Sequence, residues 1–151
     1  MEPLVQLNNQ AKLSEHFVLG EFTKSGSHPE VYNIPSHEAI ANLKRLCGWL
    51  EVLRERSGTP IRINSGYRSP QLNRAIHGNA NSNHMTGCAC DIRVSGMEQA
   101  LRYAVILMDY ADESKQEFDE LLIEKNRYGA IWVHFAVRPK DNRRKILFVN
   151  A

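Results

Sequence analysis

The sequence predicts an α+β fold, in which helices pack on one side of a small and mainly antiparallel sheet. Two observations predict it. Helical apolar spacing recurs in the first two thirds of the chain, and three β-rich runs follow one another at its end. A length of 151 residues is that of one ordinary domain. We therefore expect a single domain over 1–151, with residues 1–12 as a loose N-terminal arm.

The composition argues against several classes of protein. The 19 Lys and Arg residues nearly balance 17 Asp and Glu residues, so no nucleic-acid or anionic-membrane partner is expected. A hydrophobic fraction of 42% argues against disorder. The sequence contains no run of about 18 apolar residues, so we expect no membrane insertion. The N-terminus lacks the pattern of a secretory signal, so we expect cytoplasmic synthesis. The three cysteines are expected to be reduced thiols.

The first strong helix is predicted from Ser36 to about Arg56, after a short helix or turn within 13–22. Ser36 follows a proline and can cap the helix, and the sequence Ser-Gly-Thr-Pro at 57–60 ends it. Apolar residues recur between these limits at helical spacing: Ile40, Leu43, Leu46, Cys47, Leu50 and Leu53.

Short elements follow in the middle of the chain. Residues 61–64 and 89–94 alternate as strands do, and the Asn-rich segment 79–87 between them is predicted to be a loop. Ser69 followed by Pro70 predicts the capped start of a short helix that ends before Gly78.

The last third begins with a predicted helix through about Tyr110, opened by a capping box of Ser95 and Glu98. Its core face is predicted to hold Leu101, Ala104, Val105 and Met108. Three strands follow, over 118–124, 131–137 and 145–149, with Arg127-Tyr128-Gly129 as the turn between the first two. The basic run 138–145 is expected to be a solvated turn.

Three side chains, His84, Asp91 and His134, stand out as candidate metal ligands. His84 lies in the polar loop, and Asp91 follows in the next strand, so the loop can fold back to aim both at one point. Strand alternation in 131–137 places His134 with Trp132 on the face opposite the apolar core residues. Two imidazoles and one carboxylate leave one tetrahedral position open, which is the pattern of a catalytic zinc site.

The residues alone leave other interpretations open. A single histidine in a strand is often a half-buried packing residue, and a buried aspartate is often a turn residue. Cys88 and Cys90 form a rival ligand pair, but strand alternation places them opposite Asp91 and beside Ile92. We therefore interpret both cysteines as small core residues.

A series of motifs resembles the zinc D-Ala-D-Ala carboxypeptidase family of cell-wall peptidases, in particular its small branch carried by phages and bacteria. The motifs are SGYRSPQLN at 65–73, SNHMTGCACDI at 82–92, FDELLIE at 118–124 and WVH at 132–134. The resemblance runs from about Leu13 to Val137, and it implies a hedgehog/DD-peptidase-like fold.

The resemblance also implies roles for individual residues. It implies a zinc ion held by His84, Asp91 and His134, with Arg68 binding a carboxylate or carbonyl of the substrate. An arginine suits a carboxylate because its guanidinium presents a rigid fork of donors. Ser82 is expected to orient its loop or contact substrate, or else to form only a turn hydrogen bond, and Trp132 is expected to pack or to line the cleft.

A zinc peptidase also needs a general base. In several relatives an acidic residue lies three positions before the last histidine ligand, but here that position is Ile131, which should point away from His134. Glu124 matches the acidic residue of the family's Leu-Ile-x-Glu strand and is the expected base, unless it is an ordinary surface residue at a strand end. Asp119 and Glu120 are weaker candidates, expected to be more solvated.

Two functions remain at this point. The resemblance implies a zinc-dependent peptidase of peptidoglycan stem peptides, of D-Ala-D-Ala carboxypeptidase or endopeptidase (endolysin) type. We expect the protein to be a monomer. The absence of an acid at position 131 motivates the alternative, an inactive zinc-bearing domain that binds cell-wall peptides or has a structural role. The missing secretory signal fits a phage or prophage lysis enzyme that reaches the wall by a separate route, or a cytoplasmic enzyme.

Overall fold

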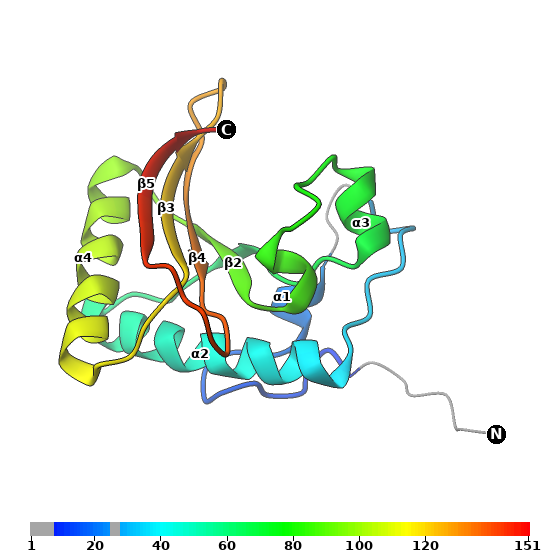
Figure 1. The fold of residues 1–151 in the computed structure, drawn as a ribbon, viewed down its shortest axis with the longest axis horizontal. Helices are drawn as coiled ribbons and strands as arrows, with labels where there is room; N and C mark the ends of the chain where they lie inside the picture. Colours follow the sequence, from blue (N-terminus) through cyan, green and yellow to red (C-terminus); the bar gives the residue numbers. More distant parts are fainter. Residues whose placement is uncertain (1–7, 25–27) are drawn as a thin grey trace.

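A computed structural model describes residues 8–24 and 28–151 and contains a five-stranded sheet in the order β1-β2-β4-β3-β5. Figure 1 shows the long helices α2 and α4 on one side of this sheet and the segment carrying α3 on the other. The elements are α1 Gly20–Thr23, α2 His37–Ser57, β1 Ile63–Ser65, α3 Pro70–Ala75, the 3-10 turn η1 Asn83–Thr86, β2 Ala89–Arg93, α4 Met97–Ser114, β3 Glu120–Lys125, β4 Ile131–Ala136 and β5 Lys145–Asn150. The predicted α+β class is confirmed.

The predicted first long helix is confirmed as α2, and its ends are formed by the residues that the sequence indicated. Ser36 Oγ accepts a hydrogen bond of 3.1 Å from the Ala39 amide, which satisfies one of the free N–H groups of the first turn. Gly58 ends the helix in the left-handed conformation, with φ of 71°, and its amide donates to the Arg54 carbonyl. The apolar face of α2 lies in the core against the sheet.

The hairpin of β3 and β4 is also confirmed, with β4 at the centre of the sheet. In β4 the side chains of Val133 and Phe135 are fully buried in the core, so His134 and Trp132 lie on the opposite face, as strand alternation predicts. Asp91 of β2 lies directly opposite His134 on one side, and Leu122 of β3 lies opposite it on the other. This register makes the exposed face of the sheet the place where the polar residues meet.

The sheet is mixed, because β5 pairs in parallel with β3 while the other pairs are antiparallel. Both edges of β4 are already occupied by β2 and β3. The chain therefore turns back after β4 and adds β5 to the free edge of β3, where it runs in the direction of that strand. The prediction of a mainly antiparallel sheet holds for the other three pairs.

Several details predicted for α4 are wrong, although Ala104 is buried and Met108 packs against the core as predicted. The predicted capping box does not form: Gly96 is the N-cap residue, and the Ser95 amide bonds instead to the side chain of Gln99 at 2.8 Å. The core face is displaced, since Leu101 and Val105 are 44% and 51% exposed. The buried face consists of Ala100, Tyr103, Ala104, Leu107 and Ala111. The three alanines of this face let α4 approach its neighbours closely. The helix continues past Tyr110, whose ring packs edge-on against Trp49 at 5.0 Å.

The N-terminal arm expected at 1–12 lies partly outside the described residues. Its last residues, 8–12, are attached to the body: the Leu19 amide donates to the Ala11 carbonyl at 2.8 Å, and Lys12 forms a bridge with Val18. The three cysteines are free thiols, as expected, and all are buried, with Cys88 and Cys90 on the side opposite Asp91. Among the described residues, no helix combines the length and the apolar character needed to span a membrane.

Candidate metal centre

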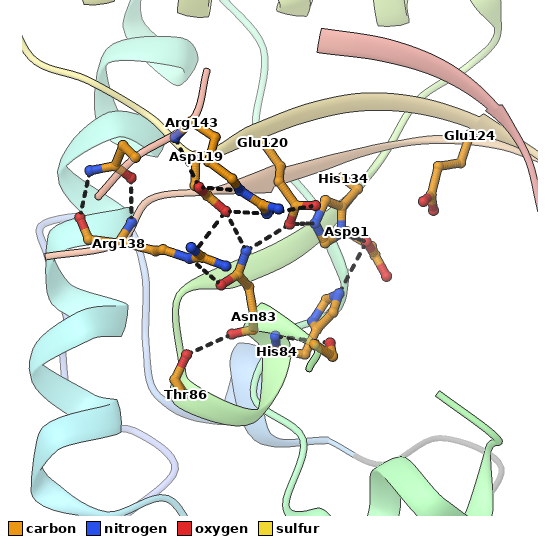
Figure 2. Close-up of polar contacts among 12 residues, drawn as sticks. Asn83, His84, Thr86, Asp91, Asp119, Glu120, Glu124, His134, Arg138 and Arg143 are labelled. Atoms are coloured by element: carbon orange, nitrogen blue, oxygen red, sulfur yellow. Dashed lines mark hydrogen bonds and ion pairs between the residues drawn. The ribbon is translucent and has the colours of Figure 1, made fainter. Parts of the chain in front are cut away.

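His84, Asp91 and His134 converge on the open face of the sheet, and one ligand atom from each lies within 4.8 Å of the others. They come from η1, β2 and β4 respectively (Figure 2). The Asp91 Oδ1 atom lies 3.4 Å from His84 Nε2 and 3.1 Å from His134 Nδ1. All three side chains are almost entirely buried. The structure therefore brings together the residues that the sequence singled out, with two nitrogens facing one carboxylate oxygen.

The segment around His84 is fixed by local hydrogen bonds. Ser82 Oγ accepts from the His84 amide at 3.1 Å and starts the 3-10 turn. Gly87 ends it with φ of 76°, and a Cβ atom at this position would lie only 2.4 Å from the Ala39 carbonyl oxygen of α2. A glycine is needed here for both the conformation and the close approach. Ser82 thus forms the turn hydrogen bond, and it also lines the cavity that contains the three side chains.

The orientation of the His84 ring is fixed by the hydrogen bond of its Nδ1 atom. His84 Nδ1 lies 2.7 Å from the Gly66 carbonyl oxygen, which can only accept a hydrogen bond. The Nδ1 atom therefore carries a proton, and the Nε2 atom on the other side of the ring faces Asp91. Contacts of this kind are what orient histidine ligands in metal sites.

The electrostatics of the cluster favour a cation. Burial opposes the charge on Asp91, but the two histidines outweigh burial and hold the pKa of Asp91 well below its usual range. Burial also opposes protonation of His134, yet its hydrogen bonds to Asp91 and Glu120 raise its pKa to about 9. A metal cation is able to replace that proton, because the same carboxylates stabilise either positive charge.

The donor set fits a zinc ion. Two imidazole nitrogens and one carboxylate oxygen are ordinary zinc ligands, and three protein ligands leave the fourth position open, as in catalytic sites. The three atoms lie close enough to surround one ion, and the cavity beside them has a volume of about 800 Å³. Of the rival thiol ligands, Cys90 lies in the core cluster and Cys88 is buried just before β2, and neither lines the cavity beside the three side chains.

Glu124 lies on the same face as this cluster and lines the same cavity. It stands opposite Trp132 in the strand pair, and Trp132 Nε1 donates a hydrogen bond to Glu124 Oε2. Burial, together with the negative charge of Asp91, raises the pKa of Glu124. Figure 2 shows its carboxylate apart from the hydrogen-bonded network around His134. The surface interpretation of Glu124 does not hold, and Trp132 contacts the site through this glutamate.

Arg68 lies at another wall of the cavity. Its backbone amide donates to the His84 carbonyl at 3.0 Å, so the two segments are joined directly. Its Nη2 atom lies 3.5 Å from Asp91 Oδ2, and its side chain is only 16% exposed. This long contact holds the guanidinium near the cluster, and Arg68 lines the cavity. The solvated-loop interpretation of Arg68 is therefore excluded.

The expectation that Asp119 and Glu120 are solvated is wrong. Asp119 has no exposed surface, and Glu120 Oε1 lies 3.0 Å from His134 Nε2. The basic segment after β4 is also not simply solvated, because Arg138 and Arg143 both pair with Asp119. Alternation along β3 could have found Glu120, which shares a face with Glu124. Which residues the carboxylates of Asp119 and Glu120 pair with depends on the strand register and on how the β4–β5 connection folds over the site, so the sequence alone does not predict these pairs.

The model of a family described as Peptidase M15 matches residues 15–121, which include η1, β2 and the start of β3. No curated protein matches the chain.

Proposed function

The chain belongs to the peptidase M15 family, and from this premise we propose that it is a zinc-dependent peptidase that hydrolyses the stem peptides of peptidoglycan. The observation that carries the proposal is the convergence of His84, Asp91 and His134 in one cavity with a partly buried carboxylate, Glu124, and a guanidinium, Arg68. Such a cavity combines a metal site, a base and an anchor for a charged substrate.

The proposed zinc ligands are His84 Nε2, Asp91 Oδ1 and His134 Nδ1, the three atoms that face one another. Zinc bound there would polarise the scissile carbonyl and make the attacking water more acidic. The protein's part is to hold the three ligands in place before the ion arrives. The Gly66 carbonyl does this for His84, and β-sheet pairing does it for Asp91 and His134.

Glu124 is the proposed general base. Its raised pKa makes it a better proton acceptor than an ordinary surface carboxylate, and its bond from Trp132 orients it. In this role Glu124 takes a proton from the attacking water and later gives it to the leaving amine. The position used by several relatives holds Ile131 here, which packs against the core and carries no acid.

Arg68 is the proposed anchor for the peptide. The cavity is open, so its guanidinium is accessible to a carboxylate at or near the end of a stem peptide. A terminal carboxylate would correspond to a D-Ala-D-Ala carboxypeptidase, and a carboxylate further from the cleaved bond would correspond to an endopeptidase of the endolysin type. A single binding pocket of this kind serves either reaction.

A second candidate is a wall-peptide-binding domain without turnover. The observation that favours it is Ile131, since the acid used by several relatives is missing at that position. The two candidates differ in what Glu124 does, so one variant distinguishes them.

The test is to incubate the zinc-loaded protein with purified peptidoglycan and defined stem peptides, and to identify the products by mass spectrometry. We expect cleavage that is abolished by a chelator and reduced about 10²–10⁴-fold in kcat by Glu124→Gln, with zinc still bound. Glu98→Gln, a neutralisation on the exposed face of α4, is the matched control. Zinc binding without any product would reject the peptidase and favour the binding domain.

A further inference from the structure

We propose that Glu120 is a positioning residue, which holds the His134 ring with Nδ1 directed at Asp91 and is itself held by Asn83. The inference deepens the proposed function, on which its zinc-binding consequence rests. Glu120 is not one of the three proposed ligands, but it contacts one of them, His134, at the ring nitrogen that does not face Asp91 (Figure 2).

The His134 ring lies between two carboxylates. Its Nδ1 atom is 3.1 Å from Asp91 Oδ1, and its Nε2 atom is 3.0 Å from Glu120 Oε1. A half-turn of the ring would replace both nitrogens with C–H groups, and both contacts would be lost. The pair of carboxylates therefore specifies one of the two orientations. With the Nε2 proton donated to Glu120, the Nδ1 lone pair is available to a cation beside Asp91.

Glu120 is in turn fixed by Asn83. The side-chain amide of Asn83 donates one hydrogen bond of 2.7 Å to Glu120 Oε1 and another of 2.8 Å to Asp119 Oδ2. Its own carbonyl oxygen accepts from Arg138 Nε at 3.0 Å, which identifies the orientation of the amide. Asn83 directly precedes His84. One short segment therefore supplies the proposed ligand His84 and the residue that holds Glu120 against His134.

The charge of Glu120 is balanced from the β4–β5 connection. Arg143 Nη2 lies 3.6 Å from Glu120 Oε2 and 2.8 Å from Asp119 Oδ2. Arg143 Nε and its backbone amide both donate to Asp119 Oδ1 at 3.0 Å. Because Asp119 is fully buried, this set of bonds ties the connection to the start of β3. The Glu120 carboxylate is thus supported on both oxygens and has one orientation.

The two glutamates of β3 therefore have different tasks. Glu120 contacts His134 on the ring edge that faces away from Asp91, whereas Glu124 lines the same cavity and accepts a hydrogen bond from Trp132. Loss of Glu120 should weaken zinc binding, while loss of Glu124 should reduce turnover with zinc retained. A carboxylate behind a histidine ligand typically contributes about 10–100-fold to metal affinity.

The experiment measures zinc affinity by competition with a chromophoric chelator and the absorption spectrum of the cobalt-substituted protein. For Glu120→Gln we expect a zinc Kd about 10–100-fold higher and an altered cobalt spectrum. Glu98→Gln should match the wild type in both. Glu120→Asp keeps the charge beside Arg143 but shortens the side chain, so it should fold and still bind zinc more weakly. A wild-type Kd and cobalt spectrum in Glu120→Gln would overturn the proposal.

A second measurement does not need the metal. In the metal-free protein, we expect a protected His134 Nε2 proton resonance in the NMR spectrum, which disappears in Glu120→Gln and persists in Glu98→Gln. An unchanged resonance in Glu120→Gln would show that Glu120 does not orient the ring. A wild type that binds no zinc would instead contradict the proposed function, and the resonance would still decide whether Glu120 positions His134.

Discussion

Glu120 and Glu124 lie four residues apart on one face of β3, yet their surroundings move their pKa values in opposite directions. The hydrogen bond from His134 lowers the pKa of Glu120 to about 2, against the effect of burial. Burial and the charge of Asp91 raise the pKa of Glu124. Neighbouring carboxylates with separated pKa values are a common arrangement where one is a fixed anion and the other exchanges protons. The roles proposed for the two residues follow this division.

At the same scale, Arg68 should contribute to substrate binding through its forked donors. We expect Arg68→Lys to lower kcat/KM for a stem peptide about 10–100-fold, because a charge-assisted hydrogen bond contributes about 1.5–3 kcal/mol. The measurement is steady-state kinetics with zinc-loaded protein. A substrate in which the terminal carboxylate is amidated should show no further loss with this variant, and equal losses on both substrates would contradict the anchor role.

Asp119 should make the stability of the protein depend on acid pH. Arg143 and Asn83 lower its pKa to about 2 against burial, below the ordinary value of an unfolded aspartate. The ionised form is therefore favoured in the folded state, so its contribution is full above about pH 4 and is lost as the pH falls toward 2. In chemical denaturation between pH 5 and 3, we expect Asp119→Asn to lose less stability than the wild type. Parallel losses would mean that Asp119 is not the titrating group.

At the scale of elements, the site depends on the tight turn at Gly87, which ends η1 where it contacts α2. Gly87 has a positive φ, and its missing side chain lets the turn meet the Ala39 carbonyl. We expect Gly87→Ala to lower the free energy of unfolding by at least about 1–2 kcal/mol and to weaken zinc binding by displacing His84. Gly48→Ala is the matched control, since a Cβ there meets nothing within 4 Å inside α2. It should stabilise by about 0.5–1 kcal/mol.

Sequence patterns predicted most of these elements because their signals are local. Strand alternation was enough to place His134 on the open face, and Ser36 and Ser69 cap the helices that follow them. The buried face of α4 was predicted only in part, because three alanines and Tyr103 are buried there, whereas the apolar Leu101 and Val105 are exposed. The start of α4 also differs from the prediction, since the N-cap residue is Gly96 and not Ser95.

The hydrogen-bonded network that holds Glu120 against His134 could not be predicted from local sequence patterns. Its members come from η1, β3 and the β4–β5 connection, and their contacts depend on the strand register and on the crossing of β5 to the far edge of β3. Buried charges such as Asp119 resemble surface charges in a sequence, because only the folded chain supplies the arginines that balance them.

At the scale of the whole molecule, the proposed zinc site links three separate segments of the chain, η1, β2 and β4. An ion that binds only the folded state should stabilise it by about 2.7 kcal/mol at a free concentration 100 times its Kd. For a chain of this size we expect the Tm to rise by roughly 5–10 °C with zinc and to return after chelation. His134→Ala should lose this response, and an equal rise in that variant would mean that zinc binds elsewhere.

The most direct test of the proposed zinc site is an anomalous difference map, measured at the zinc absorption edge from crystals grown with zinc. We expect one strong peak at about 2.0–2.2 Å from His84 Nε2, Asp91 Oδ1 and His134 Nδ1, on the side open to the cavity. A peak at the thiols of Cys88 and Cys90, or no peak among the three proposed ligands at a saturating zinc concentration, would contradict it.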